Sequence, residues 1–209
     1  MHTLRLSAIK FKVRRFAMQY SMIAVVLINV CTSRALAQDE HAHTQNAQNQ
    51  QATPDGQRQR GELLRIVRES TERFKDVAAA EAEGYALQFG CVTGPESGAM
   101  GLHYVNMALV NAGVLDATRP QIVIYEPKPG GGLRLIGADY LLIKEAWDKK
   151  KQGPPQLMGQ LFHLFGSPNR FGLPAFYTLH VWAWKDNPNG AFVNWHPNVS
   201  CEWFAGQNP

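Results

Sequence analysis

The spacing of apolar residues changes along the chain and divides it into segments of different character. Residues 21–30 form a nearly continuous apolar run, whereas from residue 61 apolar positions recur every three or four residues. That second spacing predicts one amphipathic helix of about 22 residues, which ends before Gly84. Beyond Tyr85 the apolar positions alternate with polar ones, as in half-buried strands. The predicted strands are residues 86–92, 102–106, 121–126, 133–143 and 176–184.

The order of these elements indicates the fold class. Residues 127–132 read Pro-Lys-Pro-Gly-Gly-Gly and are typical of a hairpin loop between two antiparallel strands. Shorter helices are predicted at residues 105–111 and 144–150, and the sequence contains no internal repeat. About 150 ordered residues suffice for one core. We therefore expect an α+β fold, a single domain in which one long N-terminal amphipathic helix packs on an antiparallel β-sheet.

The first 37 residues have the order of a cleavable signal peptide. Basic residues precede the apolar run, and Ala35-Leu36-Ala37 follows it with small residues at the two positions that signal peptidase requires. The run has about ten residues, roughly half of the ~20 that span a bilayer, so no permanent membrane anchor is expected. Residues 38–60 are rich in Gln and Asn and lack large apolar side chains, which predicts a disordered leader. Residues 61–209 then form the single domain.

Removal of residues 1–37 changes the charge of the protein. That segment holds six of the 21 Lys and Arg residues and none of the 17 Asp and Glu residues. The remaining chain carries 15 basic and 17 acidic residues, a net charge of −2. The pI of about 9.0 therefore belongs to the export signal and gives no support to a nucleic-acid partner.

Cysteine usage agrees with a periplasmic or secreted location. Cys31 would leave with the signal, and the exported chain would keep only Cys91 and Cys201. Two cysteines in an oxidising compartment most simply form a disulfide. The alternative is a pair of buried free thiols.

Two strand-borne histidines make a metal site a candidate. Residues two apart on a strand share a face, so Thr178, His180, Trp182 and Trp184 would point the same way. His103 lies in another predicted strand, next to small residues that leave room for a ligand. Two neutral imidazoles and one carboxylate suit zinc or copper and leave a coordination position open. The alternative is a core histidine that satisfies a backbone carbonyl.

The third ligand is chosen by strand register. If Glu126 faces Leu133 across the hairpin, Asp139 lies on a leucine-rich face, where a carboxylate is costly unless it is paired or bound to metal. Glu126 would lie beside the loop, in solvent. The two acids would be roughly 20 Å apart and could not bind the same ion. We choose Asp139 first and Glu126 second, although a bulge at Gly137 would change the register.

Two further histidines are weaker candidates for a third imidazole. His163 lies in Leu-Phe-His-Leu-Phe, and His196 lies between a tryptophan and a proline. Each has an equally good structural interpretation, and no tight His-x-x-His spacing favours either one.

Four segments resemble a family of exported bacterial proteins of uncharacterised activity. They are Met-Gly-Leu-His-Tyr-Val-Asn at residues 100–106, Tyr-Glu-Pro at 125–127, His-Val-Trp-Ala-Trp at 180–184, and the stretch from Asn187 to Cys201. The resemblance spans roughly residues 84–201 and implies an exported single domain without an assigned mechanism. In that family the position of His196 often looks like Asn, and acids occur at both Glu126 and Asp139.

Three functional hypotheses follow. The first is a periplasmic or secreted domain with a zinc or copper site at His103, His180 and Asp139. If it is an enzyme, which the sequence leaves open, a metal-bound water would act on a small molecule. The second is a metal-free module in which Trp182, Trp184 and Tyr104 form a wall for a sugar or aromatic ligand. The third treats these residues as core and assigns function to an outer surface that binds an envelope protein.

A bacterial host that exports the full precursor is expected to release a chain that begins at Gln38, because cleavage follows Ala37. Intact-mass measurement of the periplasmic protein checks this. A periplasmic chain that retains the apolar run would contradict it.

Overall fold

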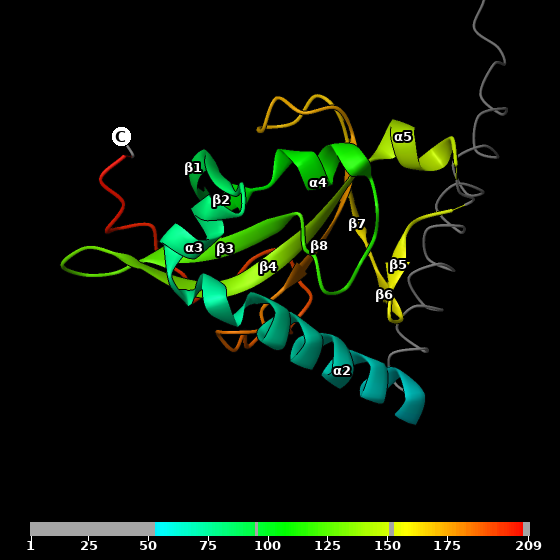
Figure 1. The fold of residues 1–209 in the computed structure, drawn as a ribbon, viewed down its shortest axis with the longest axis horizontal. Coiled ribbons are helices and arrows are strands. Elements are labelled where there is room, and N and C mark those ends of the chain that lie inside the picture. The colour runs from blue at the N-terminus through cyan, green and yellow to red at the C-terminus, as the bar shows by residue number, and fades with distance from the viewer. Residues whose placement is uncertain (1–52, 95, 151–152, 207–209) are drawn as a thin grey trace, which may run out of the picture. The chain divides into compact units, whose positions relative to one another are not determined.

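The computed structural model describes residues 53–94, 96–150 and 153–206, and Figure 1 shows their arrangement. The predicted signal peptide and most of the predicted leader lie outside the described residues. Among the helices described, none has the length and apolarity that crossing a bilayer requires.

The N-terminal helical region begins earlier than predicted and is interrupted. It comprises α2 (Pro54–Thr71), the short 3-10 helix η1 (Glu72–Lys75) and α3 (Val77–Ala82). The Thr53 side chain caps α2 by accepting from the Gly56 N–H at 3.0 Å, and Pro54 occupies the first turn. Residues 54–60, predicted to be disordered, are therefore helical. The predicted single helix is wrong at Asp76, which caps α3 through the Ala78 N–H.

One antiparallel sheet carries the rest of the fold. Its strand order is β1-β2-β3-β4-β8-β7. The strands are β1 (Ala86–Gly94), β2 (Gly98–Val105), β3 (Ile122–Pro127), β4 (Leu133–Ile143), β7 (His163–Phe165) and β8 (Phe176–Val181). The α+β class is confirmed, and each of the five predicted strands is present, although β8 ends at Val181 and not at Trp184. Helices α4 (Met107–Ala112) and α5 (Lys144–Asp148) and the hairpin of β5 (Gln156–Leu157) and β6 (Gln160–Leu161) complete the described elements.

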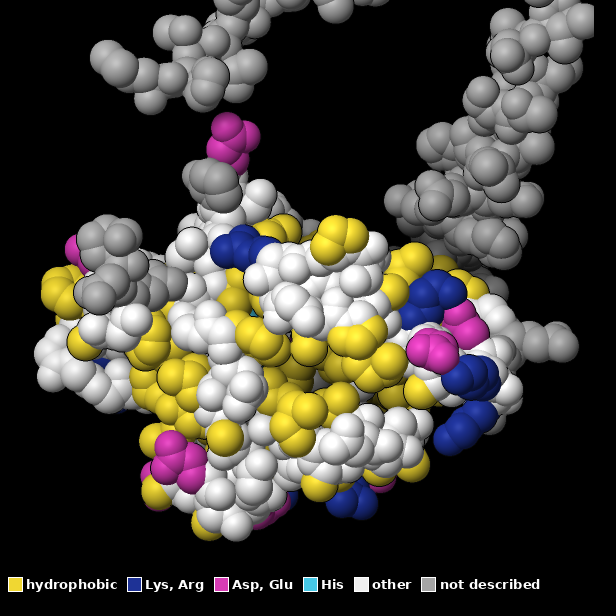
Figure 2. Space-filling model, turned by 90° about the horizontal axis from the view of Figure 1, so that it is seen from above, with side chains coloured by type: hydrophobic (Ala, Val, Ile, Leu, Met, Phe, Trp, Pro, Cys, Tyr) yellow, Lys and Arg dark blue, Asp and Glu magenta, His cyan; other side chains and the backbone are white. Residues whose placement is uncertain are grey.

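The sheet has two differently covered faces. On one face Leu63 and Val67 of α2 pack with Tyr140 and Leu179 in a fully buried cluster. Residues 166–175, between β7 and β8, project on the side seen from above in Figure 2. That view shows apolar side chains gathered around a hollow. The fold thus offers a helix-covered face for stability and a second face that is partly open.

The register of β3 against β4 differs from the prediction. Ile122 pairs with Asp139 and Ile124 with Gly137, but after a bulge Glu126 pairs with Arg134. The predicted pairing of Glu126 with Leu133 is therefore wrong, because β3 continues to Pro127, which pairs with Leu133. The bulge, an extra residue on β4 beside Gly137, shifts the register once more on the Asp139 side. Asp139 is four positions from Glu126 along the ladder, or ~13 Å, which still excludes a shared ion.

Glu126 is buried rather than exposed, which corrects the prediction. Its side chain accepts from Lys185 at 2.7 Å, from the Ser200 N–H at 3.1 Å and from Arg134. Burial by itself raises the pKa of Glu126, but the bonds from Arg134, Lys185 and Ser200 outweigh it and leave the pKa lowered. Next to Ser200, the predicted disulfide between Cys91 and Cys201 is present. The disulfide and the hydrogen bond from Ser200 to Glu126 thus both attach the C-terminal segment to the sheet.

Replacement of Glu126 by Gln is expected to destabilise the fold by about 2 kcal/mol at pH 7, because it removes charge-assisted bonds from buried partners. Since the folded pKa lies below the ordinary value of 4.5, this stabilisation is complete above pH 4.5. It is lost as the pH falls through the folded pKa. Urea unfolding at pH 7 and pH 3 measures the difference between wild type and variant. Glu145→Gln, which alters an exposed pair with Lys149, serves as control and should change little. Equal effects of the two substitutions would contradict this account.

Candidate metal centre

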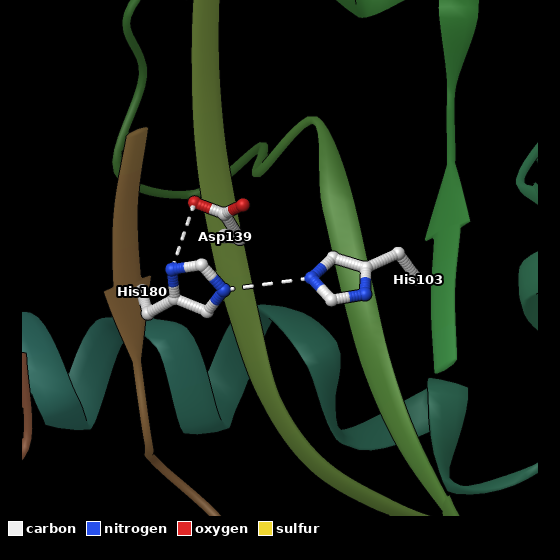
Figure 3. A group of neighbouring side chains, drawn as sticks. All are labelled: His103, Asp139 and His180. Carbon is white, nitrogen blue, oxygen red and sulfur yellow. Dashed lines mark hydrogen bonds and ion pairs between the residues drawn. The ribbon is translucent and has the colours of Figure 1, made fainter. Parts of the chain in front are cut away.

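Three buried side chains from three strands converge on the sheet face opposite α2. They are His103 of β2, Asp139 of β4 and His180 of β8, and Figure 3 shows them pointing toward one another. One ligand atom from each lies within 4.8 Å of the others. The three residues that the sequence predicted for the first hypothesis therefore form one group.

Strand pairing explains how distant parts of the chain meet here. Asp139 and His180 are direct cross-strand partners, so their side chains share a face. His103 lies two residues further along the sheet, in the next set of cross-strand neighbours on the same face. There it pairs with Ile124 of β3, which in turn pairs with Gly137 of β4. A Cβ on Gly137 would lie 2.6 Å from the Val181 carbonyl oxygen, so only glycine fits against the end of β8. Because residue 137 is glycine, no side chain from this position of β4 stands between His103 and His180.

His103 is oriented by a backbone carbonyl. Its Nδ1 lies 3.2 Å from the Gly101 carbonyl oxygen, and because a carbonyl only accepts, Nδ1 carries the hydrogen. Gly101 has a φ of +87°, and a Cβ there would lie 2.6 Å from the Tyr125 carbonyl oxygen. Glycine is thus required for the backbone that presents this acceptor. The Nε2 lone pair of neutral His103 is left facing the site.

His180 presents its two nitrogens to the other two members of the group. Its Nε2 is 3.4 Å from Nε2 of His103, and its Nδ1 is 3.8 Å from Oδ1 of Asp139. The second distance is longer than a hydrogen bond, and Nδ1 makes no hydrogen bond within the described part of the chain. The Trp182 ring stacks on His180 with centroids 5.8 Å apart, which fixes the plane of the imidazole. If Nδ1 of His180 carries the hydrogen and faces the carboxylate, Nε2 of His180 has a free lone pair. This lone pair then faces that of Nε2 of His103 at a distance of 3.4 Å.

Asp139 is buried without a cationic partner. Its Oδ1 accepts from the Thr178 hydroxyl at 2.5 Å and from the Leu179 N–H at 3.1 Å. Both donors are neutral, and His180 is the sole ionisable group paired with Asp139 among the described residues. Glu126, by contrast, binds a lysine and an arginine. The charge of Asp139 is therefore not compensated by a fixed cation.

Burial sets the protonation states of the three groups. It lowers the pKa of His103 to about 4, with a further contribution from His180, and lowers the pKa of His180 to about 3, with a further contribution from His163. Burial also raises the pKa of Asp139 to about 6, against the attraction of His103 and the bonds from Thr178 and Leu179. At pH 7 the site therefore holds two neutral imidazoles and a largely ionised carboxylate. These are the forms that bind metal ions.

A small cavity adjoins the group. Its volume is about 20 Å³, which is space for about one water molecule. His103, Asp139, Thr178 and His180 form its polar side, and the rest of the lining is apolar. An ion or a small ligand atom would thus be held away from bulk water.

The other predicted ligands lie outside the group. His163 is exposed, and its ring Nε2 lies 3.2 Å from the Phe192 carbonyl oxygen. His196 is fully buried, but its Nδ1 accepts from the Asn198 N–H and its ring meets the edge of Trp182. Glu126 is engaged by Lys185, as described above. His163 and His196 therefore have the structural roles that the sequence allowed, whereas Glu126 has a buried ionic role that the sequence did not predict.

The predicted wall of Trp182, Trp184 and Tyr104 does not form. Trp184 donates from Nε1 to the Thr71 hydroxyl at 2.9 Å, so it packs against the end of α2. Tyr104 lies edge-on to Tyr125, whose hydroxyl donates to the Phe74 carbonyl of η1. The alternation of side chains stops at Val181, where β8 ends, which is why Trp184 does not share the face of His180.

The aromatic residues that do line the cavity were not predicted. Four phenylalanines lie around it, at positions 89, 165, 171 and 176. They are scattered over nearly 90 residues, and two of them lie outside any predicted strand. The other two, Phe89 and Phe176, lie in predicted strands, but no pattern indicated that they would meet.

Comparisons with known proteins supply no family. The chain matches no protein-family model, no curated protein and no solved structure. Function is therefore inferred from the geometry, burial and charge of the site.

Proposed function

We propose that the protein is an exported domain that binds one transition-metal ion through Nε2 of His103 and Nε2 of His180, with Asp139 as third ligand. The 3.4 Å separation of the two nitrogens carries this proposal. Ligands ~2.0–2.1 Å from a tetrahedral zinc ion are ~3.4 Å apart. The two imidazoles therefore already have the spacing that such an ion requires.

The second nitrogen of each ring supports the same assignment. Metal-ligating histidines usually donate their other N–H to a carbonyl or a carboxylate, which fixes the ring and raises its basicity. Nδ1 of His103 has the Gly101 carbonyl, and Nδ1 of His180 faces Asp139. Both rings thus direct Nε2 at the same point.

The carboxylate supplies the charge and the third donor. Oδ1 of Asp139 is held by Thr178 and Leu179, whereas Oδ2 accepts no hydrogen bond from the described residues. Oδ2 is therefore the oxygen available to a metal ion. A divalent cation would compensate a buried carboxylate that otherwise lacks a positive partner. Glu126 is excluded as a substitute, because Lys185 and Arg134 already neutralise it.

The donor set favours zinc or copper. Two imidazoles and a carboxylate suit these ions, and both cysteines of the described chain are in the disulfide, so no thiolate is available. Three protein ligands leave one position open. A water bound there is the simplest nucleophile if the protein acts on a small molecule.

Export is part of the proposal. The Cys91–Cys201 disulfide supports an oxidising compartment. The basic-apolar-small order of residues 1–37 and the resemblance to exported bacterial proteins support the same location. The expected partners are a metal ion and a small molecule, without nucleic acid or a membrane anchor.

The domain, purified from the periplasm without a tag and freed of metal, is expected to bind one equivalent of Zn²⁺ or Cu²⁺. His103→Ala and His180→Ala should each weaken binding by about 100-fold or more, because each removes a ligand. Asp139→Asn keeps the size and the bonds of Oδ1 but removes the charge, and should weaken binding by about 10- to 100-fold. Isothermal titration calorimetry and plasma mass spectrometry measure affinity and content.

His163→Ala is the matched control, since it removes an imidazole that lies outside the group and should leave the affinity unchanged. Circular dichroism verifies that each variant is folded. Undiminished binding in the His103→Ala, His180→Ala double variant would refute the proposal. A folded wild-type protein that takes up neither ion would do the same.

A further inference from the structure

Phenylalanines surround the outer side of the cavity. Phe165 stacks on Phe176 with ring centroids 5.1 Å apart and planes at 1°, and Phe171 meets both rings edge-on at 6.0 Å. Phe89 extends the cluster from β1, with its ring 5.5 Å from that of Phe171. Figure 2 shows the apolar surface on this side and the hollow within it. We call these four residues the phenylalanine mouth.

Phe89 is held over the cavity at a cost. Its side chain is 45% exposed, and its φ of +65° is rare for a residue with a bulky side chain. The residue lies in an irregularity of β1 between Gln88 and Cys91, and such bulges redirect side chains. Strained backbone and exposed aromatic surface both occur preferentially at binding sites.

The loop at residues 166–175 brings Phe171 to the mouth and contacts β1 through Arg170 and Phe171. Asn169 organises the loop through bonds to the backbone of Gly166 and Leu173. Arg170 donates to the Thr93 carbonyl oxygen at 2.7 Å. This bond and the contact of Phe89 with Phe171 join the loop to β1, and we call the loop the lid of the mouth.

We propose that the phenylalanine mouth admits a small, flat, uncharged aromatic molecule whose one polar group binds beside His103 and His180. This inference rests on the proposed function, because the polar group would meet the ion or the neutral imidazoles. The apolar lining matches an aromatic ring, and His103, Asp139, Thr178 and His180 are the polar groups of the lining. A cavity that holds benzene measures ~150 Å³, against about 20 Å³ here, so the lid moves outward when the ring enters.

Titration of the zinc-loaded and the metal-free domain with 4-methylphenol tests this inference, with toluene and glucose as comparison probes. One molecule of 4-methylphenol is expected to bind, toluene more weakly because it lacks the hydroxyl, and glucose not at all. Phe89→Ala and Phe171→Leu should each weaken binding at least about tenfold through lost ring contacts, with zinc content unchanged. Leu164→Ala, which alters an exposed apolar residue that does not line the cavity, is the control.

A second variant examines the lid through Arg170, which does not itself line the cavity. Arg170→Ala removes the bond to Thr93, so association and dissociation of 4-methylphenol should both accelerate in stopped-flow fluorescence. Rates identical to those of wild type would overturn the role of the loop.

The outcomes separate this inference from the metal proposal. Stoichiometric zinc together with no binding of any aromatic probe, or binding indifferent to Phe89→Ala and Phe171→Leu, overturns the inference alone. Binding of 4-methylphenol that depends on the mouth in a protein that takes up neither zinc nor copper supports the mouth and overturns the metal site.

Discussion

The cost of burying a carboxylate is the constraint around which this fold is organised. Two acids lie inside the sheet, and each is accommodated in its own way. Glu126 binds Lys185 and Arg134, so its charge is compensated within the protein. Asp139 has only the neutral donors Thr178 and Leu179 and the histidine pair. An uncompensated buried charge is unfavourable unless a cation joins it, and the arrangement of His103 and His180 provides the place for one.

Glu126 also supports the candidate metal centre, through the C-terminal segment that it holds. Glu126 and the disulfide hold the C-terminal segment on the sheet, and His196 in that segment pairs with Ala99 of β2. The same segment accepts the Trp182 indole N–H at the Val193 carbonyl, 2.6 Å away. Because Trp182 stacks on His180, its fixed position limits rotation of that imidazole. A ligand-binding histidine is thereby preorganised by packing that lies outside the group itself.

Local patterns in the sequence were sufficient to predict the strands and to select the three candidate residues. They were not sufficient to predict the strand register or the contacts between distant residues. Alternation placed His180 on its face, and the cost of an apolar environment singled out Asp139. The structure places Asp139 beside the two histidines although the predicted register was wrong, since β3 continues to Pro127 and β4 has an extra residue beside Gly137. Burial of Glu126 depends on Lys185, 59 residues away, and no local pattern encodes such a contact. The phenylalanine mouth escaped prediction for the same reason. The helix interruption at Asp76 follows from a cap within an otherwise continuous apolar pattern.

Diffraction from crystals of the zinc-loaded domain, collected at the zinc absorption edge, locates the bound ion. The account predicts one anomalous peak between β2 and β8, ~2.0–2.1 Å from Nε2 of both His103 and His180 and within reach of Asp139. A peak at surface carboxylates or at His163, with the two Nε2 atoms joined by a direct hydrogen bond, would contradict it.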